Sequence, residues 1–146
     1  MRDTKKILRK AVYDALGSLT YNSASVPVYD EKTPQGNTAN MFVILSTQSE
    51  TAVERNSTAF ITQSSIDLEI WHKTSYEVSK DGIDDVYEDI IDTIFPSIGS
   101  LGITAPSGFQ FQEGFRESSV TQSVQLSETE SVLLTRMKLT FLITEQ

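Results

Sequence analysis

Apolar and polar residues alternate along the segment from Thr58 to His72, and this alternation predicts one long strand. Ser65, Asp67 and Glu69 share one parity of the segment. The opposite parity is apolar or small and comprises Phe60, Thr62, Ser64, Ile66, Leu68 and Ile70. Because successive side chains of a strand point to opposite faces, only one face of this strand is expected to enter a core.

The period changes after Gly82, where apolar residues begin to recur at spacings of three and four. This spacing predicts a helix from Asp81 to Phe95 with one apolar stripe. The stripe consists of Ile83, Val86, Tyr87, Ile90, Ile91 and Ile94. A strand and a helix that each have one apolar face are expected to bury those faces against each other.

A similar stripe predicts a first helix that begins at Asp3 or Thr4 and ends near Leu19. Its apolar positions are Ile7, Leu8, Ala11, Val12, Ala15, Leu16 and Leu19.

Two short strands are expected before the long one. The proline in Val26-Pro27-Val28-Tyr29 favours an edge strand, because proline cannot donate a hydrogen bond to a neighbouring strand. The next residues, Asp30 to Asn40, are predicted to form a loop. The compact apolar run from Met41 to Thr47 is typical of a buried strand, which would pair with the long strand.

Two strands are predicted near the end of the chain, one from Phe109 to Phe115 and one from Val132 to Thr144, paired as an antiparallel hairpin. Two polar segments are interpreted as connections. Gln48 to Asn56 is predicted to be a projecting hairpin tip, and Arg116 to Ser131 a flexible loop or an arm that orders on a partner. We expect both to be mobile in the isolated protein and ordered in an assembly.

These elements predict a single domain over residues 1–146 of the α+β class. The expected architecture is a mainly antiparallel sheet of four or five strands with two helices packed on it, in the order α-β-β-β-α-β-β. No apolar run approaches the roughly 20 residues of a membrane span, so no membrane partner is expected.

Composition narrows the possible functions. The chain has no cysteine, which excludes disulfides, thiolate metal sites and thiol nucleophiles. Its formal net charge is −8, yet five of its 12 basic residues lie in the first ten positions, with one of its 20 acidic residues. The acidic remainder argues against a surface that binds duplex DNA. A basic end and an acidic body either suit head-to-tail contacts between subunits or are simply solvated.

Residues able to support catalysis are few, and neither an enzyme nor a cofactor or metal site is predicted. His72 is the only histidine and lies at the end of the long strand. The polar face of the second helix carries many carboxylates, but a metal site needs ligands that converge from more than one element. Trp71 falls on the polar side of the long strand, where it is either covered by a loop or used in a subunit contact.

The order of these elements and several short motifs resemble the tail-completion, or tail terminator, proteins of long-tailed double-stranded DNA bacteriophages. The resemblance spans nearly the whole chain and lies in the order and spacing of the motifs. It departs from the family at Asn40-Met41, where a proline and an aromatic residue are common, and in the long tract from Arg116 to Ser131. The motifs that carry it are the opening helix Ile7 to Leu19, Val28-Tyr29-Asp30, Thr33-Pro34-Gln35-Gly36, Phe42-Val43-Ile44-Leu45, Ile66-Asp67-Leu68-Glu69-Ile70-Trp71, the helix Val86 to Phe95 and the closing strand to Ile143.

The resemblance implies a structural virion protein that is present in the host cytoplasm during assembly and resides at the head–tail junction. Such a protein forms a homohexameric ring on the head-proximal end of the tail tube, stops tube polymerisation and joins the tail to the head. Its implied partners are the tail tube protein and a head-completion or neck protein, with genomic DNA passing through the ring without specific binding. Two alternatives stay open: a neck or head-completion protein on the portal side, or a small α+β enzyme or ligand-binding domain using the acidic helix or His72.

Within this interpretation, two kinds of residues are candidates for function. Asp67 and Glu69 are the favoured candidate acids of the channel wall, since an acidic wall would let DNA slide past without binding. The alternative acids are Asp85, Glu88, Asp89 and Asp92 of the second helix. The candidate subunit or partner contacts are Gln48, Glu50, Glu54, Arg55, Trp71, Arg116, Val120, Val124 and Leu126.

Overall fold

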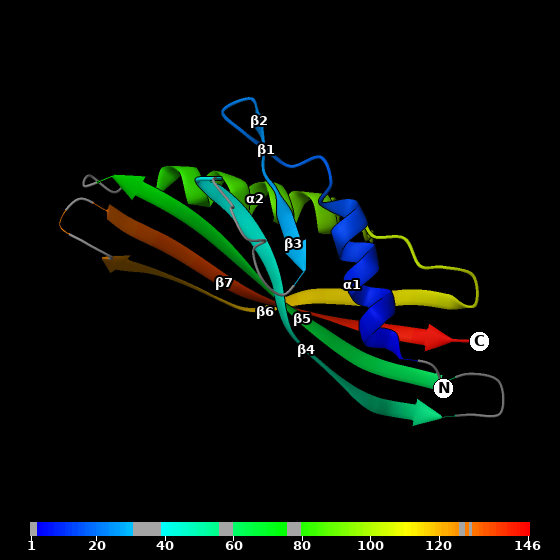
Figure 1. Ribbon diagram of the computed structural model, residues 1–146. Coiled ribbons are helices and arrows are strands. Elements are labelled where there is room, and N and C mark those ends of the chain that lie inside the picture. The colour runs from blue at the N-terminus through cyan, green and yellow to red at the C-terminus, as the bar shows by residue number, and fades with distance from the viewer. Residues whose placement is uncertain (1–2, 31–38, 56–59, 76–79, 126–127, 129) are drawn as a thin grey trace.

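The computed structural model describes residues 3–30, 39–55, 60–75, 80–125, 128 and 130–146. Its main feature is a twisted five-stranded sheet in the order β3-β4-β5-β7-β6 (Figure 1). β3 runs parallel to β4, and the other neighbouring strands are antiparallel. The strands of this sheet are β3 (Val28–Asp30), β4 (Met41–Arg55), β5 (Phe60–Ser75), β6 (Phe109–Gln125) and β7 (Glu130–Glu145).

The helices α1 (Thr4–Ala15) and α2 (Asp81–Ile94) both lie on one face of the sheet (Figure 1). α1 packs on β4 and β5, and α2 packs on β5 and β7. The apolar stripes of both helices meet the apolar parity of the strands in one core, whose fully buried members include Leu8, Leu68, Ile90 and Met137. The structure therefore confirms an α+β fold with two helices on a mainly antiparallel sheet.

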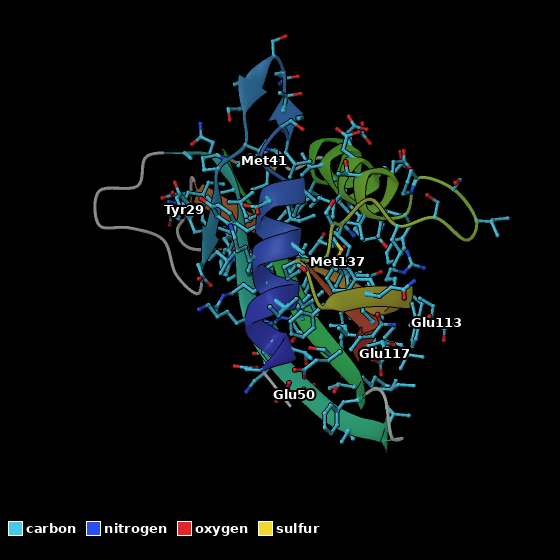
Figure 2. All side chains as sticks on the ribbon, turned by 90° about the vertical axis from the view of Figure 1, so that its right-hand side faces the viewer. Tyr29, Met41, Glu50, Glu113, Glu117 and Met137 are labelled. Atoms are coloured by element: carbon cyan, nitrogen blue, oxygen red, sulfur yellow. The ribbon has the colours of Figure 1, made fainter. Side chains whose placement is uncertain are left out.

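The N-terminus of α1 is held by two carboxylates. Asp3 is the N-cap and accepts a hydrogen bond from the backbone N–H of Lys5 at 2.9 Å. Glu50, from β4, accepts from both the backbone N–H and the hydroxyl of Thr4, at 3.2 and 2.6 Å. Figure 2 shows Glu50 beside this end of the helix. The charge of Glu50 is thus placed where the helix dipole favours an anion.

Some predicted boundaries were wrong by a few residues. α1 ends at Ala15 instead of Leu19, because Leu16 leaves helical geometry at ψ 7° just before Gly17. The segment after α1 contains an additional two-stranded sheet that was not predicted, β1 (Thr20–Tyr21) with β2 (Ala24–Ser25). β3 is an edge strand as expected, but it begins at Val28, one residue after the proline.

Parts of two predicted elements lie outside the described residues. The long central strand is described from Phe60 and continues past His72 to Ser75, while positions 58 and 59 are not described. Most of the loop predicted from Asp30 to Asn40 also lies outside the described part, and with it the motif Thr33-Pro34-Gln35-Gly36.

The larger error concerns the two polar segments interpreted as a hairpin tip and a loop. β4 continues through Gln48 to Arg55, and β6 continues through Arg116 to Gln125. Both remain paired along this length, apart from bulges. The hairpins β4–β5 and β6–β7 extend toward opposite ends of the sheet (Figure 1). The segments lack core residues because they lie at the edges of the sheet, where the helices cover little of them, not because they lack regular structure.

Candidate assembly surfaces

The sheet face opposite the helices, which we call the open face, is not covered by α1 or α2. It carries the second parity of β5, including Asp67, Glu69 and Trp71, which pair in register with Lys138, Arg136 and Leu134 of β7. Both candidate channel acids therefore lie on one face of the sheet, next to each other along β5, as their spacing in the sequence requires.

Each of these acids lies opposite a basic residue. Arg136 donates two hydrogen bonds to one carboxylate oxygen of Glu69, at 2.8 and 3.1 Å. Lys138 lies opposite Asp67 and within 3.5 Å of Glu117, a β6 carboxylate that also accepts a hydrogen bond from Thr140. Partial burial raises the pKa of Asp67, and the positive charges of Lys138 and Arg136 oppose this shift. This part of the open face therefore carries paired charges with one carboxylate in excess.

A hollow of about 230 Å³ lies within this charged region. Its lining combines β5, β6 and β7 and comprises Asp67, Ser118, Val120, Gln122, Leu134, Arg136 and Lys138. Val120 is 62% exposed at its rim. The hollow combines apolar and charged groups in an open depression, which suits a protein contact better than a small-molecule site that would enclose its ligand.

Trp71 belongs to an aromatic cluster on the open face, near the edge strand β3. Its ring stacks on Phe42 with the centroids 6.2 Å apart, and Tyr29 packs against Phe42 from β3. The indole N–H of Trp71 donates to Glu69 at 3.2 Å. Trp71 is half-buried, so within the described residues strand side chains cover part of it.

Several predicted contact residues are already engaged within the chain. Glu50 binds the N-terminus of α1, and the Gln48 side chain donates to the backbone carbonyl of Lys5 at 2.8 Å. Arg116 donates to the Tyr87 hydroxyl and lies over the Tyr87 ring, which ties β6 to α2. These three residues hold helices to strands, and the periodicity of the sequence gave no sign of this.

The remaining predicted contacts within the described residues lie at the end of β4 and in the second half of β6. Val120 and Val124 are 62% and 42% exposed on β6. Two further exposed apolar residues are Val53 on β4 and Phe115 on β6. The side chains of Glu54 and Arg55 and the whole of Leu126 lie outside the described residues, although β4 runs through Arg55. Exposed apolar residues on an edge strand are typical of a surface that meets another protein.

His72, the only histidine, is partly buried. It lies on the face of β5 that the helices cover, with the ring of Tyr21 edge-on at 5.7 Å, and burial lowers the pKa of its imidazole. Its buried Nδ1 has no hydrogen-bond partner among the described residues. Within those same residues, no group of three or more histidine, cysteine or acidic side chains could hold a metal ion. No helix in the described part is long and apolar enough to cross a membrane.

Comparison with known proteins finds a chain of similar fold. No family model matches the chain, and no curated protein sequence matches it. A solved structure described as "Virion of native gene transfer agent (GTA) particle" contains a chain that matches with a TM-score of 0.67 at 13% identity. The match covers 97% of this chain and 99% of that chain. The two chains share one fold from end to end.

The share of the two chains that this match covers tells whether the extended hairpins belong to the shared fold. Because nearly all of both chains is included, the extended hairpins fall within the shared fold and are not additions to it. The feature of these surfaces that sequence reasoning missed is the basic side of the open face, Arg136 and Lys138. Their alternation with the core residues of the last strand was visible, but their partners Glu69 and Glu117 are distant in sequence and could not be assigned without the strand register.

Proposed function

We propose that this protein is a non-enzymatic structural component of a phage-like virion, and that it acts as a tail terminator. In this role it forms a homohexameric ring on the head-proximal end of the tail tube, ends tube polymerisation and joins the tail to the head. Its partners are then further copies of itself, the tail tube protein and a head-completion or neck protein. Genomic DNA passes through the ring.

The observation that carries the proposal is the end-to-end likeness of fold to a chain of a virion particle. The helices and the strands of the large sheet also follow the element order on which the resemblance to tail terminators rests. The surfaces support an assembly role, since exposed apolar residues lie on both extended hairpins and the open face carries a hollow lined partly by charged residues. An oligomer needs such surfaces, whereas a monomeric enzyme needs a cleft with convergent reactive groups.

Tube length tests the proposed role directly. Tail tube protein from the same particle is polymerised alone and with purified wild-type protein, and the tubes are measured by electron microscopy. We expect tubes of limited length with a ring at one end when the protein is present, and long uncapped tubes without it. Tubes that grow equally long in both reactions, with no density at either end, would overturn the tail-terminator role. Binding at the head side only would favour the portal-side alternative.

A further inference from the structure

The sheet has two edges whose strands extend beyond their neighbours. β3 covers only Val43 to Leu45 of β4, so within the described residues the backbone edge of β4 from position 46 to 55 has no strand beside it. In the same described part, β6 is the last strand on the opposite side of the sheet. Long edges that lack a partner strand readily pair with another chain.

The two edges lie at the same end of the sheet. One cross-strand row runs from Thr51 through Gln63 and Leu142 to Glu113. The free part of β4 is therefore level with the first half of β6. β4 and β6 also run in opposite directions, because each step from β4 through β5 and β7 to β6 is antiparallel. A second copy placed beside the first in the same orientation would bring the two edges together as an antiparallel pair, without a large shift along the strands.

The same placement brings oppositely charged helices together. α1 lies on the β4 side of the helix layer and α2 on the β7 side, so α2 of one copy would lie beside α1 of the next. α2 contains six carboxylates and no basic residue, and all six are exposed. α1 contains four basic residues and one acidic residue, with Lys6 and Lys10 exposed. The strand edges and the helix charges thus point independently to one contact.

We propose that subunits join head to tail by pairing the free edge of β4 in one copy with the first half of β6 in the next, and that α1 and α2 of neighbouring copies form a complementary charged contact above this pair. The inference deepens the proposed function, since it rests on the ring and names the surfaces that close it. The contact is heterologous, so each subunit uses a different edge toward each of its two neighbours.

Because the chain has no cysteine, engineered disulfides test this pairing cleanly. Thr51→Cys is combined with Glu113→Cys or with Phe115→Cys, which samples two registers on the same face. β5 and β7 separate the two edges by about 14 Å within one subunit, so these pairs cannot form a disulfide inside one chain. The matched control combines Thr51→Cys with Gln122→Cys, at the far end of β6. Single variants complete the set.

After mild oxidation, denaturing gels without reductant should show a ladder of linked chains for at least one Thr51 pair. The control pair and the single variants should show no ladder. Efficient dimers from Glu113→Cys or Phe115→Cys alone would indicate a symmetric β6–β6 contact and overturn the head-to-tail proposal.

Failure of the pairing is distinguishable from failure of the proposed function. The same cysteine variants are weighed in solution under reducing conditions and added to polymerising tubes. If they form rings and cap tubes while neither Thr51 pair links on oxidation, the edge pairing is overturned and the role at the tube stands. If they link into ladders but leave tube length unchanged, the edge pairing stands and the tail-terminator role is overturned.

Charge reversal tests the helix contact separately. Glu88→Lys with Asp89→Lys on α2 should shift the population from rings toward single chains, most strongly at low salt where screening is weak. Lys6→Glu with Lys10→Glu on α1 should do the same, and an equal mixture of the two variants should recover association. Asp14→Lys, which removes the intrahelical partner of Lys10 but makes α1 more basic, is the control and should leave the rings intact. Association that is indifferent to both reversals would overturn the α1–α2 part of the contact.

Discussion

Phe141 occupies the space that a side chain at position 114 would need. A Cβ built on Gly114 would lie 2.3 Å from the Phe141 ring, which is fully buried, stacks on Phe95 and contacts Phe111. Gly114 therefore lets the exposed strand β6 lie close over a large core residue. This glycine has no positive φ, so its role follows from packing alone.

Gly114→Ala should lower the free energy of unfolding by about 1–3 kcal/mol, because the added methyl group overpacks the core beneath β6. Urea denaturation measures the loss. Gly17→Ala is the matched control, since a Cβ there would make only an ordinary contact at 3.5 Å. If Gly114→Ala is as stable as the wild type, β6 does not lie as close to Phe141 as described.

The lowered pKa of His72 links stability to pH. The folded state disfavours the charged imidazole because of burial, whereas the unfolded chain takes up a proton near the ordinary pKa of 6.5. Below pH 6.5 the unfolded state therefore binds more protons, and the free energy of unfolding falls as the pH drops from 6.5 toward the folded pKa.

His72→Phe should remove that part of the pH dependence. Denaturation of both proteins between about pH 7.5 and 5 gives the difference, which isolates His72 from the carboxylates. We expect the wild type to lose more stability than His72→Phe over this interval. Parallel curves for the two proteins would show that His72 is not protected from protonation in the fold.

At the scale of elements, the effect of a substitution in α2 on stability should depend on the face of the helix that carries it. Ile90 is fully buried against the sheet and Asp89 is exposed. Ile90→Asp places an unpaired charge in the core and should unfold the domain or cost about 4 kcal/mol or more. Asp89→Asn should change stability by at most about 0.5 kcal/mol. A circular-dichroism melt that is unchanged by Ile90→Asp would contradict this packing.

The elements differ in how much of them the sequence could predict. The helices and the central strand were predictable because one face of each enters the core, which gives a clear period in the apolar residues. The ends of β4 and β6 were not, since both of their faces are polar or exposed there and the period disappears. Their strand pairing depends on backbone hydrogen bonds to β5 and β7, and backbone groups leave no mark in the residue pattern. The mobility expected for these segments in the isolated protein stays a prediction.

The same reasoning applies to the candidate surfaces. Asp67, Glu69 and Trp71 were assigned to one face of β5 correctly, because parity alone fixes a face. Contacts between distant elements, such as Glu50 with Thr4, depend on register and helix placement. The residues that hold the fold together and those left exposed could therefore be separated only in the folded structure.

At the scale of the whole molecule, the open face names the side chains that would line a channel. We propose that Asp67 and Glu69 face the channel and keep DNA from binding to its wall. Asp67→Lys with Glu69→Lys would place two new cations beside Arg136 and Lys138, and DNA phosphates would then bind with release of counterions. Rings should still form, but assembled particles should release DNA more slowly, and the delay should shrink as salt is raised.

Single-particle measurements of DNA ejection at low and high salt check this expectation. The control adds Arg136→Glu and Lys138→Glu to the two reversals, which restores the charge balance of the face and should restore the rate. Normal ejection at low salt from the doubly reversed particles would show that the open face does not meet DNA.

The position of both helices on one side of the sheet makes the subunit thicker on that side (Figure 1). In a closed ring, an outer layer has more circumference than an inner one, and helices about 10 Å across are bulkier than strands spaced about 4.8 Å apart. Edge-to-edge closure would therefore curve the sheet toward the side without helices. The bore of the ring would be a continuous wall of strands, and the helices would form an outer belt around it.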